Sequence, residues 1–360
     1  MKEIKVSLLG SHGIPPSYGA FEETAHHLSN YLSKMKIVTY VACNANLKNH
    51  PNNINYDNKF IKLIYSPKKP GYGIIIFDLL SMIKCYLKGS RIFIFFGYEI
   101  SWIYPIFKLI GVKFITNVDG IEWRRAKWSV YIKQYFKFCE LCAVKFSNEL
   151  VYDSEGIKRY YHIIHKKKGN LIFYGSNLPN IKGKSFNLNF VDKYTINDDL
   201  KNYFVVVMRL EPENNIEVIV KAFNRSKTKK KLLIIGPSTN FFDQYCLKFC
   251  DQKKIIYLGS IYDRELLNHI RANSFCYIHG HSVGGTNPTL VEAISLNNKI
   301  ICFNSIFNRE VCKLNAKYFN NENDLIKLIE NEIVGNEFKL DERYNWDYVS
   351  KKYYDLIVHL

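Results

Sequence analysis

The chain has 360 residues, 47% of them apolar, and a formal net charge of +17 at pH 7. This length favours two domains with substantial hydrophobic cores. The longest apolar stretch, YGIIIFDLLSMIKCYL at 72–87, contains Asp78 and Lys84 and is shorter than the ~20 residues that a membrane-spanning helix needs. The sequence therefore predicts a protein that is soluble or bound to a membrane surface, and no signal peptide precedes the first predicted strand.

The positive charge is concentrated in the first half of the chain. Residues 1–185 contain 27 Lys and Arg against 12 Asp and Glu, a net charge of +15, whereas residues 186–360 have a net charge of only +2. A half this basic suits nucleic acid, an anionic membrane surface or phosphorylated substrates. Charge alone does not choose among these partners.

In the first half, short apolar runs alternate with longer amphipathic segments, which predicts a parallel sheet covered by helices on both faces. The predicted strands are 4–10, 36–43, 60–66, 91–97, 112–120, 149–154 and 170–176. The predicted helices lie near 20–33, 74–88, 127–147 and 155–164.

The alternation restarts after the polar stretch 179–202, which is interpreted as a linker. The next predicted strands are 203–210, 231–238, 254–261, 275–281 and 299–305, and the helices lie near 212–225, 240–250, 264–272 and from about 288. The last segment, 344–360, is predicted to be an amphipathic helix with one apolar face. That face contains Trp346, Val349, Tyr353 and Ile357.

The predicted fold class is α/β, with two doubly wound, Rossmann-like parallel-sheet domains. The domains are expected at 1–185 and 186–340, and a C-terminal helix at 341–360 is expected to pack back toward the first domain. Open parallel sheets bind ligands beyond the carboxyl ends of their strands. Two such sheets that face each other would form an interdomain cleft lined by these loops.

The turn between the first strand and the first helix is rich in glycine, with Gly10, Gly13 and Gly19 in GSHGIPPSYGAF. Backbone N–H groups at such a turn, together with the helix dipole, can bind an anion or sugar hydroxyls. The pattern is not GxGxxG, and the second strand ends in VACNAN without an acidic residue, so a dinucleotide site is disfavoured. A turn without a ligand is the alternative interpretation.

A second glycine-rich segment, YIHGHSVGGTNPTLVEAISL at 277–296, joins a predicted strand to a predicted helix. Pro288 suits the first turn of that helix, and Thr286 or Asn287 is expected to cap it. Loop amides at the helix N-terminus suit a nucleotide diphosphate, and Glu292, one turn in, suits the ribose hydroxyls. Alternatively, Glu292 is a solvated helix residue, and the histidines of the loop are packing or capping groups.

Arg209 directly follows the apolar run of the strand in VVVMRLEPENN. A guanidinium at a strand end can bind a phosphate through two hydrogen bonds and stabilise a departing diphosphate. The alternative is a surface ion pair with Glu211 or Glu213.

Three segments together, GSHGIPPSYGAFEETAHHL, NVDGIEWRRAKWS and HGHSVGGTNPTLVEAI, resemble retaining glycosyltransferases of the GT-B type, which have two facing Rossmann-like domains. More narrowly, they resemble the bacterial rhamnosyltransferase-like branch (glycosyltransferase family 4 type) of capsule and O-antigen synthesis. The resemblance runs from residue 4 to the last helix. It implies an acceptor held by the first domain and a nucleotide-sugar donor held mainly by the second.

The resemblance also implies individual roles: Glu292 matches the carboxylate that binds ribose, and Arg209 matches the arginine that binds the diphosphate. Two positions depart from the family pattern, since Asn214 replaces a lysine and Gly284 replaces a glutamate. The missing ammonium removes one charge-assisted contact with the diphosphate. The expected donor-binding residues are Gly10, Gly13, Arg209, Asn214, His279, His281, Gly284, Gly285, Thr286, Asn287 and Glu292.

The acceptor side is expected around NVDGIEWRRAKWS. Asp119 ends a predicted strand where related enzymes often have a histidine, and a carboxylate there can accept a hydrogen bond from a sugar or act as a base. Glu122 is the local rival, and a turn-forming Asp-Gly pair is the alternative. The expected acceptor-binding residues are Tyr18, Gly19, Glu22, Glu122, Trp123 and Arg124, and the expected catalytic residues are Arg209, Asp119 and Glu292.

These expectations combine into a retaining hexosyl transfer from a dTDP- or UDP-sugar, with rhamnose as the first candidate sugar. The chain has no DxD motif, so neither a metal nor another cofactor is expected. The acceptor is expected to be a lipid-diphosphate-linked saccharide at an anionic membrane, which predicts a peripheral protein at the cytoplasmic face.

Three other classes remain open. A nucleotide-sugar epimerase or phosphorylase of the same architecture needs the same phosphate sites. A Rossmann oxidoreductase is disfavoured by the missing fingerprint. A nucleic-acid-binding protein would also be basic, but the first half has no recognisable recognition module, so nucleic acid is not an expected partner.

Overall fold

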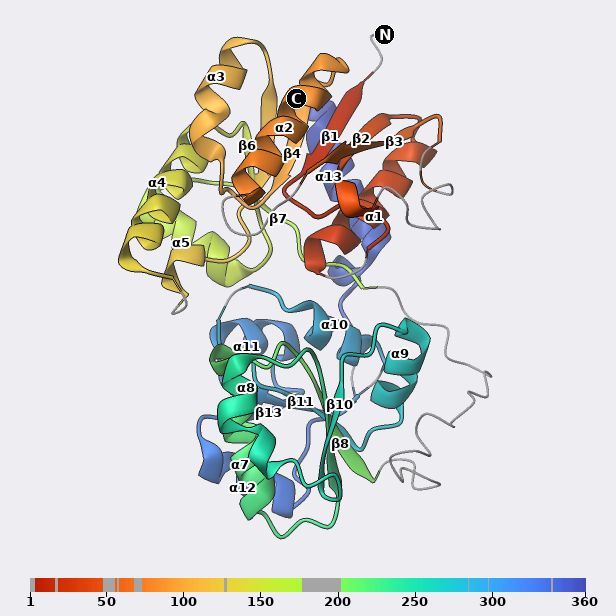
Figure 1. Cartoon of the computed structure of the whole chain (residues 1–360), viewed down its shortest axis with the longest axis vertical. Coiled ribbons are helices and arrows are strands. Elements are labelled where there is room, and N and C mark those ends of the chain that lie inside the picture. The colour runs from red at the N-terminus through yellow and green to blue at the C-terminus, as the bar shows by residue number, and fades with distance from the viewer. Residues whose placement is uncertain are drawn as a thin grey trace. The chain divides into compact units, whose positions relative to one another are not determined.

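The computed structural model describes residues 4–16, 19–47, 56, 58–67, 73–125, 128–176, 202–283, 285–296, 298–337 and 339–360. The chain divides into two compact units (Figure 1). Unit 1 comprises Met1–Gly175 and Glu342–Leu360, and unit 2 comprises Ser176–Asp341. The predicted domain boundary at 185/186 lies outside the described residues.

Unit 1 alternates strands and helices along the chain, as predicted. Its strands are β1 (Lys5–Leu9), β2 (Val38–Asn44), β3 (Ile61–Ser66), β4 (Ile92–Phe96), β5 (Lys113–Asn117), β6 (Glu149–Tyr152) and β7 (Asn170–Leu171). Its helices are α1 (Ala20–Lys34), α2 (Gly73–Leu87), α3 (Tyr104–Leu109), α4 (Val130–Phe146), α5 (Glu155–His165) and α13 (Trp346–His359). Its described short 3-10 turns are η1 (Ala45–Leu47), η3 (Ser101–Ile103), η4 (Glu122–Arg124) and η7 (Glu342–Tyr344).

Unit 2 repeats this alternation. Its strands are β8 (Tyr203–Val207), β9 (Lys231–Ile235), β10 (Ile255–Gly259), β11 (Cys276–His279), β12 (Ile300–Phe303) and β13 (Lys317–Phe319). Its helices are α7 (Ile216–Arg225), α8 (Asn240–Tyr245), α9 (Arg264–Ala272), α10 (Pro288–Ser295), α11 (Ile306–Cys312) and α12 (Glu322–Glu330). Its described 3-10 turns are η5 (Pro212–Asn214) and η6 (Leu247–Phe249).

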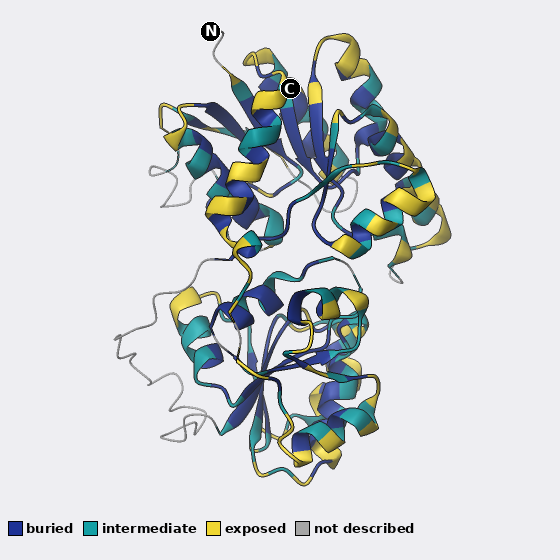
Figure 2. Ribbon diagram, turned by 180° about the vertical axis from the view of Figure 1, so that it is seen from behind, coloured by how far each residue is buried: buried dark blue, intermediate teal, exposed yellow. Residues whose placement is uncertain are grey.

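Each unit is built on one parallel sheet. In the described residues the strand orders are β3-β2-β1-β4-β5-β6-β7 in unit 1 and β10-β9-β8-β11-β12-β13 in unit 2, and all pairs are parallel. In both sheets the chain order reverses beside the first strand of the unit, which makes each sheet doubly wound. Figure 2 shows buried strands in the middle of each unit and exposed residues on the outer faces of the helices. The predicted α/β class with two such sheets is confirmed.

Helix α13 belongs to the core of unit 1. The four residues predicted to form its apolar face are all buried, in the same cluster as Val6 and Leu8 of β1. The Trp346 ring stacks on His27 of α1 at 4.5 Å between centroids. The Tyr353 hydroxyl accepts a 2.9 Å hydrogen bond from Nδ2 of Asn117, at the end of β5.

Several predicted elements are wrong in extent. The strand predicted at 170–176 forms a regular strand only at Asn170–Leu171, which pairs with β6 at the edge of the sheet. The helix predicted at 212–225 begins at Ile216, since Asn215 has a left-handed φ of 53°. The helix predicted at 127–147 begins at Val130, because the Ser129 side chain caps it. The helix predicted at 240–250 ends at Tyr245.

Candidate functional site

The loops that follow the adjacent strands β8 and β11 are tied together. Asn215 Nδ2 donates to the Gly280 carbonyl at 2.7 Å, and both N–H and Oγ of Ser282 donate to the Glu213 carbonyl at 3.1 and 2.6 Å. The contact is so close that a Cβ on Gly280 would lie 2.0 Å from the Asn214 carbonyl oxygen. The two predicted phosphate-binding loops of unit 2 therefore form one structure at the carboxyl edge of its sheet.

Helix α10 begins at this edge, at the predicted Pro288. Asn287 is the residue that caps it, because its Oδ1 accepts hydrogen bonds from N–H and Oγ1 of Thr289 at 3.0 and 2.8 Å. Thr286, the other predicted cap, is buried. The hydroxyl of Tyr277 in β11 donates to the Val207 carbonyl at 3.0 Å and lies 3.1 Å from Thr289 Oγ1, which ties the helix start to β8.

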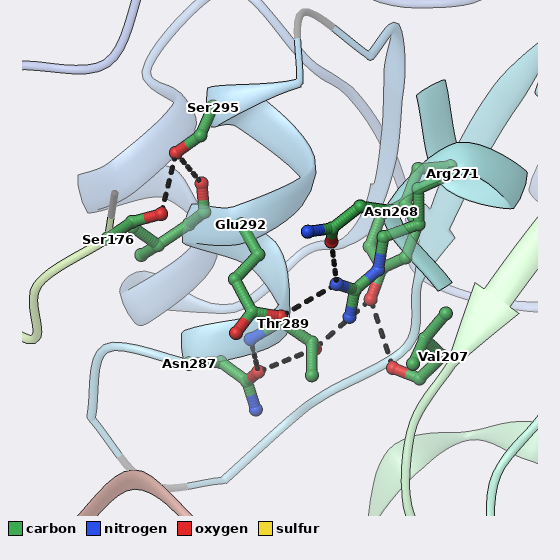
Figure 3. Close-up of polar contacts among 10 residues, drawn as sticks. Ser176, Val207, Asn268, Arg271, Asn287, Thr289, Glu292 and Ser295 are labelled. Carbon is green, nitrogen blue, oxygen red and sulfur yellow. Dashed lines mark hydrogen bonds and ion pairs between the residues drawn. The ribbon is translucent and has the colours of Figure 1, made fainter. Parts of the chain in front are cut away.

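Glu292 lies one turn into α10 and is paired with a residue that the sequence analysis missed. Its Oε2 lies 2.8 Å from Nη1 of Arg271, at the end of α9 (Figure 3). The Arg271 side chain is only 1% exposed, whereas the Glu292 side chain is 33% exposed. Glu292 thus has one oxygen fixed by a buried guanidinium.

Arg209 and Asn214, both predicted to bind the donor, occupy different environments. Arg209 is exposed, and its guanidinium makes no hydrogen bond or ion pair with any described residue, including Glu211 and Glu213. Asn214 is buried, and its Nδ2 donates to the Arg209 carbonyl at 2.6 Å. The asparagine amide therefore braces the turn that presents Arg209.

His279, at the end of β11, is fully buried, and neither ring nitrogen has a hydrogen-bond partner in the described chain. Burial, with a smaller contribution from His281, lowers the pKa of His279 well below its usual value, so the ring is neutral. The two imidazoles stack with centroids 5.7 Å apart. Gly285 is half-buried in the same loop, and Gly284 lies outside the described residues.

In unit 1, the glycines of the first loop are explained by close packing. Gly10 has φ 80°, and a Cβ there would lie 2.1 Å from the Phe96 carbonyl oxygen. Gly13 has φ 105°, and a Cβ there would lie 2.6 Å from Cys43. Neighbouring protein segments, and not necessarily a ligand, therefore require glycine at both positions.

The predicted acceptor residues of this loop also contact one another. Glu22 of α1 is buried, and its Oε1 accepts the His12 N–H at 2.7 Å. Gly19 has φ 112°, and a Cβ there would lie 2.4 Å from Glu22 Oε2. Glu22 therefore braces the loop from inside. Tyr18 lies outside the described residues.

Asp119 follows β5 in a left-handed conformation, with φ 53°. Its N–H donates to Asn117 Oδ1 at 3.0 Å, and its side chain is half-buried. Asp119 therefore lies in a polar turn at the carboxyl edge of the sheet. Its catalytic role stays a prediction.

The residues after Asp119 form a contact network. Glu122 accepts from Arg125 Nε at 2.8 Å and from Trp128 Nε1 at 2.9 Å. The indole of Trp123 donates to Oε2 of buried Glu140 at 3.0 Å. Arg124 is exposed, with its guanidinium 5.3 Å from the centre of the Trp123 ring. Of the three predicted acceptor residues here, Arg124 is the one presented to solvent.

Glu99, which follows β4 at the same sheet edge, was not among the predicted site residues. Its carboxylate folds back on Gly97, where a Cβ would lie 2.3 Å from Glu99 Oε2. Burial, together with the charges of Glu122 and Asp119, raises the pKa of Glu99 to about 7. The signal was a carboxylate directly after a predicted strand, in RIFIFFGYE.

A search for clusters of three or more His, Cys, Asp or Glu side chains that could hold a metal finds none among the described residues. Within the same part of the chain, no helix combines the length and apolarity required to cross a membrane.

Two family models match the chain. Residues 190–344 match glycosyl transferases group 1, and residues 3–177 match a domain of unknown function, DUF1972. No curated protein matches the chain in sequence.

Solved structures resemble the whole chain at low sequence identity. HepE of Anabaena, in complex with UDP, has a TM-score of 0.72 at 11% identity over 99% of this chain and 100% of that chain. Sucrose-phosphate synthase of Thermosynechococcus elongatus has a TM-score of 0.78 at 12% identity over 99% of this chain and 98% of that chain. WaaG, a glycosyltransferase involved in lipopolysaccharide biosynthesis, has a TM-score of 0.65 at 12% identity over 98% and 95%. These similarities concern the fold.

Proposed function

Because residues 190–344 form a domain of the glycosyl transferases group 1 family and the chain has a GT-B fold, it is a glycosyltransferase of the group 1 type, and we propose a specific reaction for it. The protein transfers a sugar, with rhamnose as the first candidate, from a dTDP- or UDP-linked donor to a lipid-diphosphate-linked saccharide. The anomeric configuration is retained. The product belongs to a bacterial surface polysaccharide.

The joined loops of unit 2 carry this proposal. Helix α10 begins beside them, and the positive end of its dipole favours a diphosphate there. Arg209, on the same edge, is exposed, and its guanidinium has no hydrogen-bond or ion-pair partner among the described residues. Glu292, one turn into the helix, supplies a carboxylate for the ribose hydroxyls.

In the proposed step, the bond between the anomeric carbon and the diphosphate oxygen breaks, and the acceptor hydroxyl attacks the same face. The hydroxyl proton passes to the departing diphosphate. Arg209 and the loop amides stabilise the negative charge that develops on that diphosphate. Asp119 accepts a hydrogen bond from a sugar hydroxyl, and Arg124, with the Trp123 ring, contacts the acceptor. No metal or other cofactor takes part in this proposal.

Unit 1 offers a surface for the anionic membrane that would contain such an acceptor. Tyr131, Phe138 and Leu141 of α4 are exposed at spacings that place them on one helix face. Lys137 is exposed on the same helix, and Lys108 and Leu109 are exposed on α3, which packs against α4. Exposed apolar side chains next to lysines suit the interface of a bilayer with anionic lipids. We therefore infer a peripheral protein at the cytoplasmic membrane face.

Transfer of radiolabel tests the reaction. The full chain is incubated with a lipid extract that contains lipid-linked saccharides and with labelled dTDP-rhamnose or a panel of UDP-sugars. We expect one donor to label the lipid fraction and to release its nucleoside diphosphate. Label that stays in the nucleotide pool as a different sugar would identify an epimerase, and label in sugar phosphate would identify a phosphorylase. Either result would overturn the proposal.

A further inference from the structure

We propose that Arg271 is a positioning residue that fixes Glu292 in the orientation needed to bind the ribose hydroxyls of the donor. This inference rests on the proposed function, because it assigns a role toward the same nucleotide site. Arg271 itself is too deeply buried to touch a ligand, with 1% of its side chain exposed.

The geometry makes Glu292 the counter-ion of Arg271. Nη1 of Arg271 lies 2.8 Å from Glu292 Oε2, and the same nitrogen lies 3.4 Å from Asn268 Oδ1. No other carboxylate lies within ion-pair distance of Arg271 in the part of the chain that the structure describes. A buried guanidinium needs a compensating charge, so this pair has a strong preference for one arrangement.

The pair uses only one side of the carboxylate. Glu292 Oε1 makes no hydrogen bond or ion pair with any described residue, and a third of the side chain is exposed. Figure 3 shows the two residues reaching toward each other from α9 and α10, next to the Asn287 cap. Oε2 is therefore anchored by the protein, and Oε1 stays available to a ligand hydroxyl.

Anchoring has a direct consequence for binding. A free glutamate loses side-chain entropy when a ligand immobilises it, and a carboxylate already held in place avoids that cost. An anchored residue also discriminates more sharply between ligands with and without hydroxyls, because it does not move to solvent when the hydroxyl is missing. Arg271 thus acts on ribose recognition through Glu292.

Nucleotides that differ only in the ribose hydroxyls measure this role. Calorimetry with the full chain gives the Kd of UDP, whose ribose carries the 2′ and 3′ hydroxyls, and of dTDP, whose deoxyribose carries only the 3′ hydroxyl. Each is compared with its 2′,3′-dideoxy analogue. The native protein is expected to prefer the hydroxyl-bearing nucleotide by about 10- to 100-fold, as for a hydrogen bond to a charged group. Arg271→Gln is expected to reduce this preference to less than about threefold.

A double-mutant cycle separates positioning from a general structural effect. Glu292→Gln is also expected to lose the preference, and adding Arg271→Gln to it should then change the preference no further. Arg225→Gln is the matched control. It breaks an Arg–Glu pair of the same 2.8 Å length in the same unit, but Arg225 is 63% exposed, so its Kd ratio should equal that of the native chain.

The outcomes distinguish the two proposals. If the native chain binds none of these nucleotides, the proposed function fails. If Glu292→Gln loses the preference while Arg271→Gln keeps it, the function stands and the role of Arg271 is overturned. If Arg271→Gln does not fold, Arg271→Lys decides, because it keeps the charge but lacks the planar fork. An intermediate ratio would support the proposal, and the full native ratio would overturn it.

Discussion

Arg209 and Asn214 are five residues apart, but the Arg209 side chain is exposed to solvent and the Asn214 side chain is buried. The exposed guanidinium of Arg209 has no hydrogen-bond or ion-pair partner among the described residues. The side-chain amide of Asn214, by contrast, donates a hydrogen bond to the Arg209 carbonyl. The family lysine at the position of Asn214 would add a charge near the diphosphate, and this asparagine instead fixes the turn. In the proposed reaction, stabilisation of the departing diphosphate would then depend more heavily on Arg209.

We predict that Arg209→Ala lowers kcat by on the order of 10²-fold, because it removes one donor to the charge of the transition state. The free energy of unfolding should change little, since the side chain is exposed and has no hydrogen bond or ion pair with a described residue to lose. Label transfer and urea unfolding measure the two quantities. A near-normal kcat would show that Arg209 does not contact the leaving group, and Arg209→Lys, which keeps the charge, should retain part of the rate.

Glu99 predicts a pH dependence of stability. Its pKa is 4.5 in an ordinary environment and about 7 in the folded chain, owing to burial and then to Glu122 and Asp119. Between these pH values the Glu99 carboxyl is protonated in the folded state and ionised in the unfolded state. The contribution of Glu99 to the free energy of unfolding is therefore fully present below about pH 4.5 and is lost as the pH rises through about 7.

Glu99→Gln should remove this loss. Relative to the native chain, the variant is expected to gain about 1–3 kcal/mol in the free energy of unfolding between pH 5 and pH 8. Urea unfolding of both proteins at the two pH values gives the difference. A difference that does not change with pH would mean that Glu99 titrates normally.

At the residue scale, the sequence identifies the exposed site residues better than their buried supports. Pro288 starts α10 and Asn287 caps it, as local sequence preferences predict. Arg271 gave no signal, because an arginine in LLNHIRAN reads as a solvated helix residue until the tertiary structure buries it. Glu22 gives a second example, because its carboxylate accepts a hydrogen bond from the loop. Residue spacing in the sequence does not predict the tertiary packing that decides whether such a carboxylate faces a ligand or braces a loop.

At the scale of elements, the two loops of unit 2 depend on the missing side chain of Gly280. We predict that Gly280→Ala pushes the 280 and 214 backbones apart, because its Cβ would lie 2.0 Å from a carbonyl oxygen. The expected cost is about 1–3 kcal/mol in the free energy of unfolding, as for overpacking, together with weaker nucleotide binding.

Gly259→Ala in the same unit is the control for that variant. A Cβ at Gly259 meets no atom within 4 Å, although its φ of 72° carries some backbone strain. Nucleotide affinity, measured by calorimetry, should stay unchanged in Gly259→Ala. Equal affinities of the two variants would show that the joined loops do not form the nucleotide site.

The central strands were predictable, and the elements near the ends of the sheets were less so. Strands β4, β8 and β9 contain uninterrupted apolar runs of at least four residues and are buried on both faces, so their sequence signal is strong. Helix α3 has six residues and β13 has three, and neither is long enough to show a period. Helices α11 and α12 were also not predicted, although Ser305 and Asn321 cap them.

For the molecule as a whole, the sequence pattern predicts the two parallel sheets, and the motifs predict the class of enzyme. The pattern of strands and helices sets the fold, because each parallel strand needs a crossover helix that covers the sheet. The choice of sugar, nucleotide base and acceptor depends on contacts made by loop residues, of which Tyr18 and Gly284 lie outside the described residues. The sequence therefore predicts the fold but not the substrate.

Removal of α13 is the prediction at this scale. A chain that ends at Asp341 loses four side chains from the core of unit 1, each worth about 1.5–3 kcal/mol when buried. That sum is comparable with the total stability of an ordinary domain, so unit 1 should unfold while unit 2 keeps its structure. Limited proteolysis checks this, and full-length fragments of unit 1 that resist the protease would contradict it.

Point variants supply the matched comparison. Ile357→Ala, at a buried position, should lower the free energy of unfolding by about 2–5 kcal/mol. Val358→Ala, at the exposed neighbouring position, should change it by less than about 0.5 kcal/mol.

The membership of α13 in unit 1 also affects how the protein is made. Domains usually fold as units during synthesis, with the N-terminal one first. Here the last helix of the chain completes the core around β1, and the whole of unit 2 is translated between the two. Residues 176–341 are therefore synthesised before the core of unit 1 can be completed, and nascent unit 1 must keep its unfilled apolar face from aggregating until α13 has emerged.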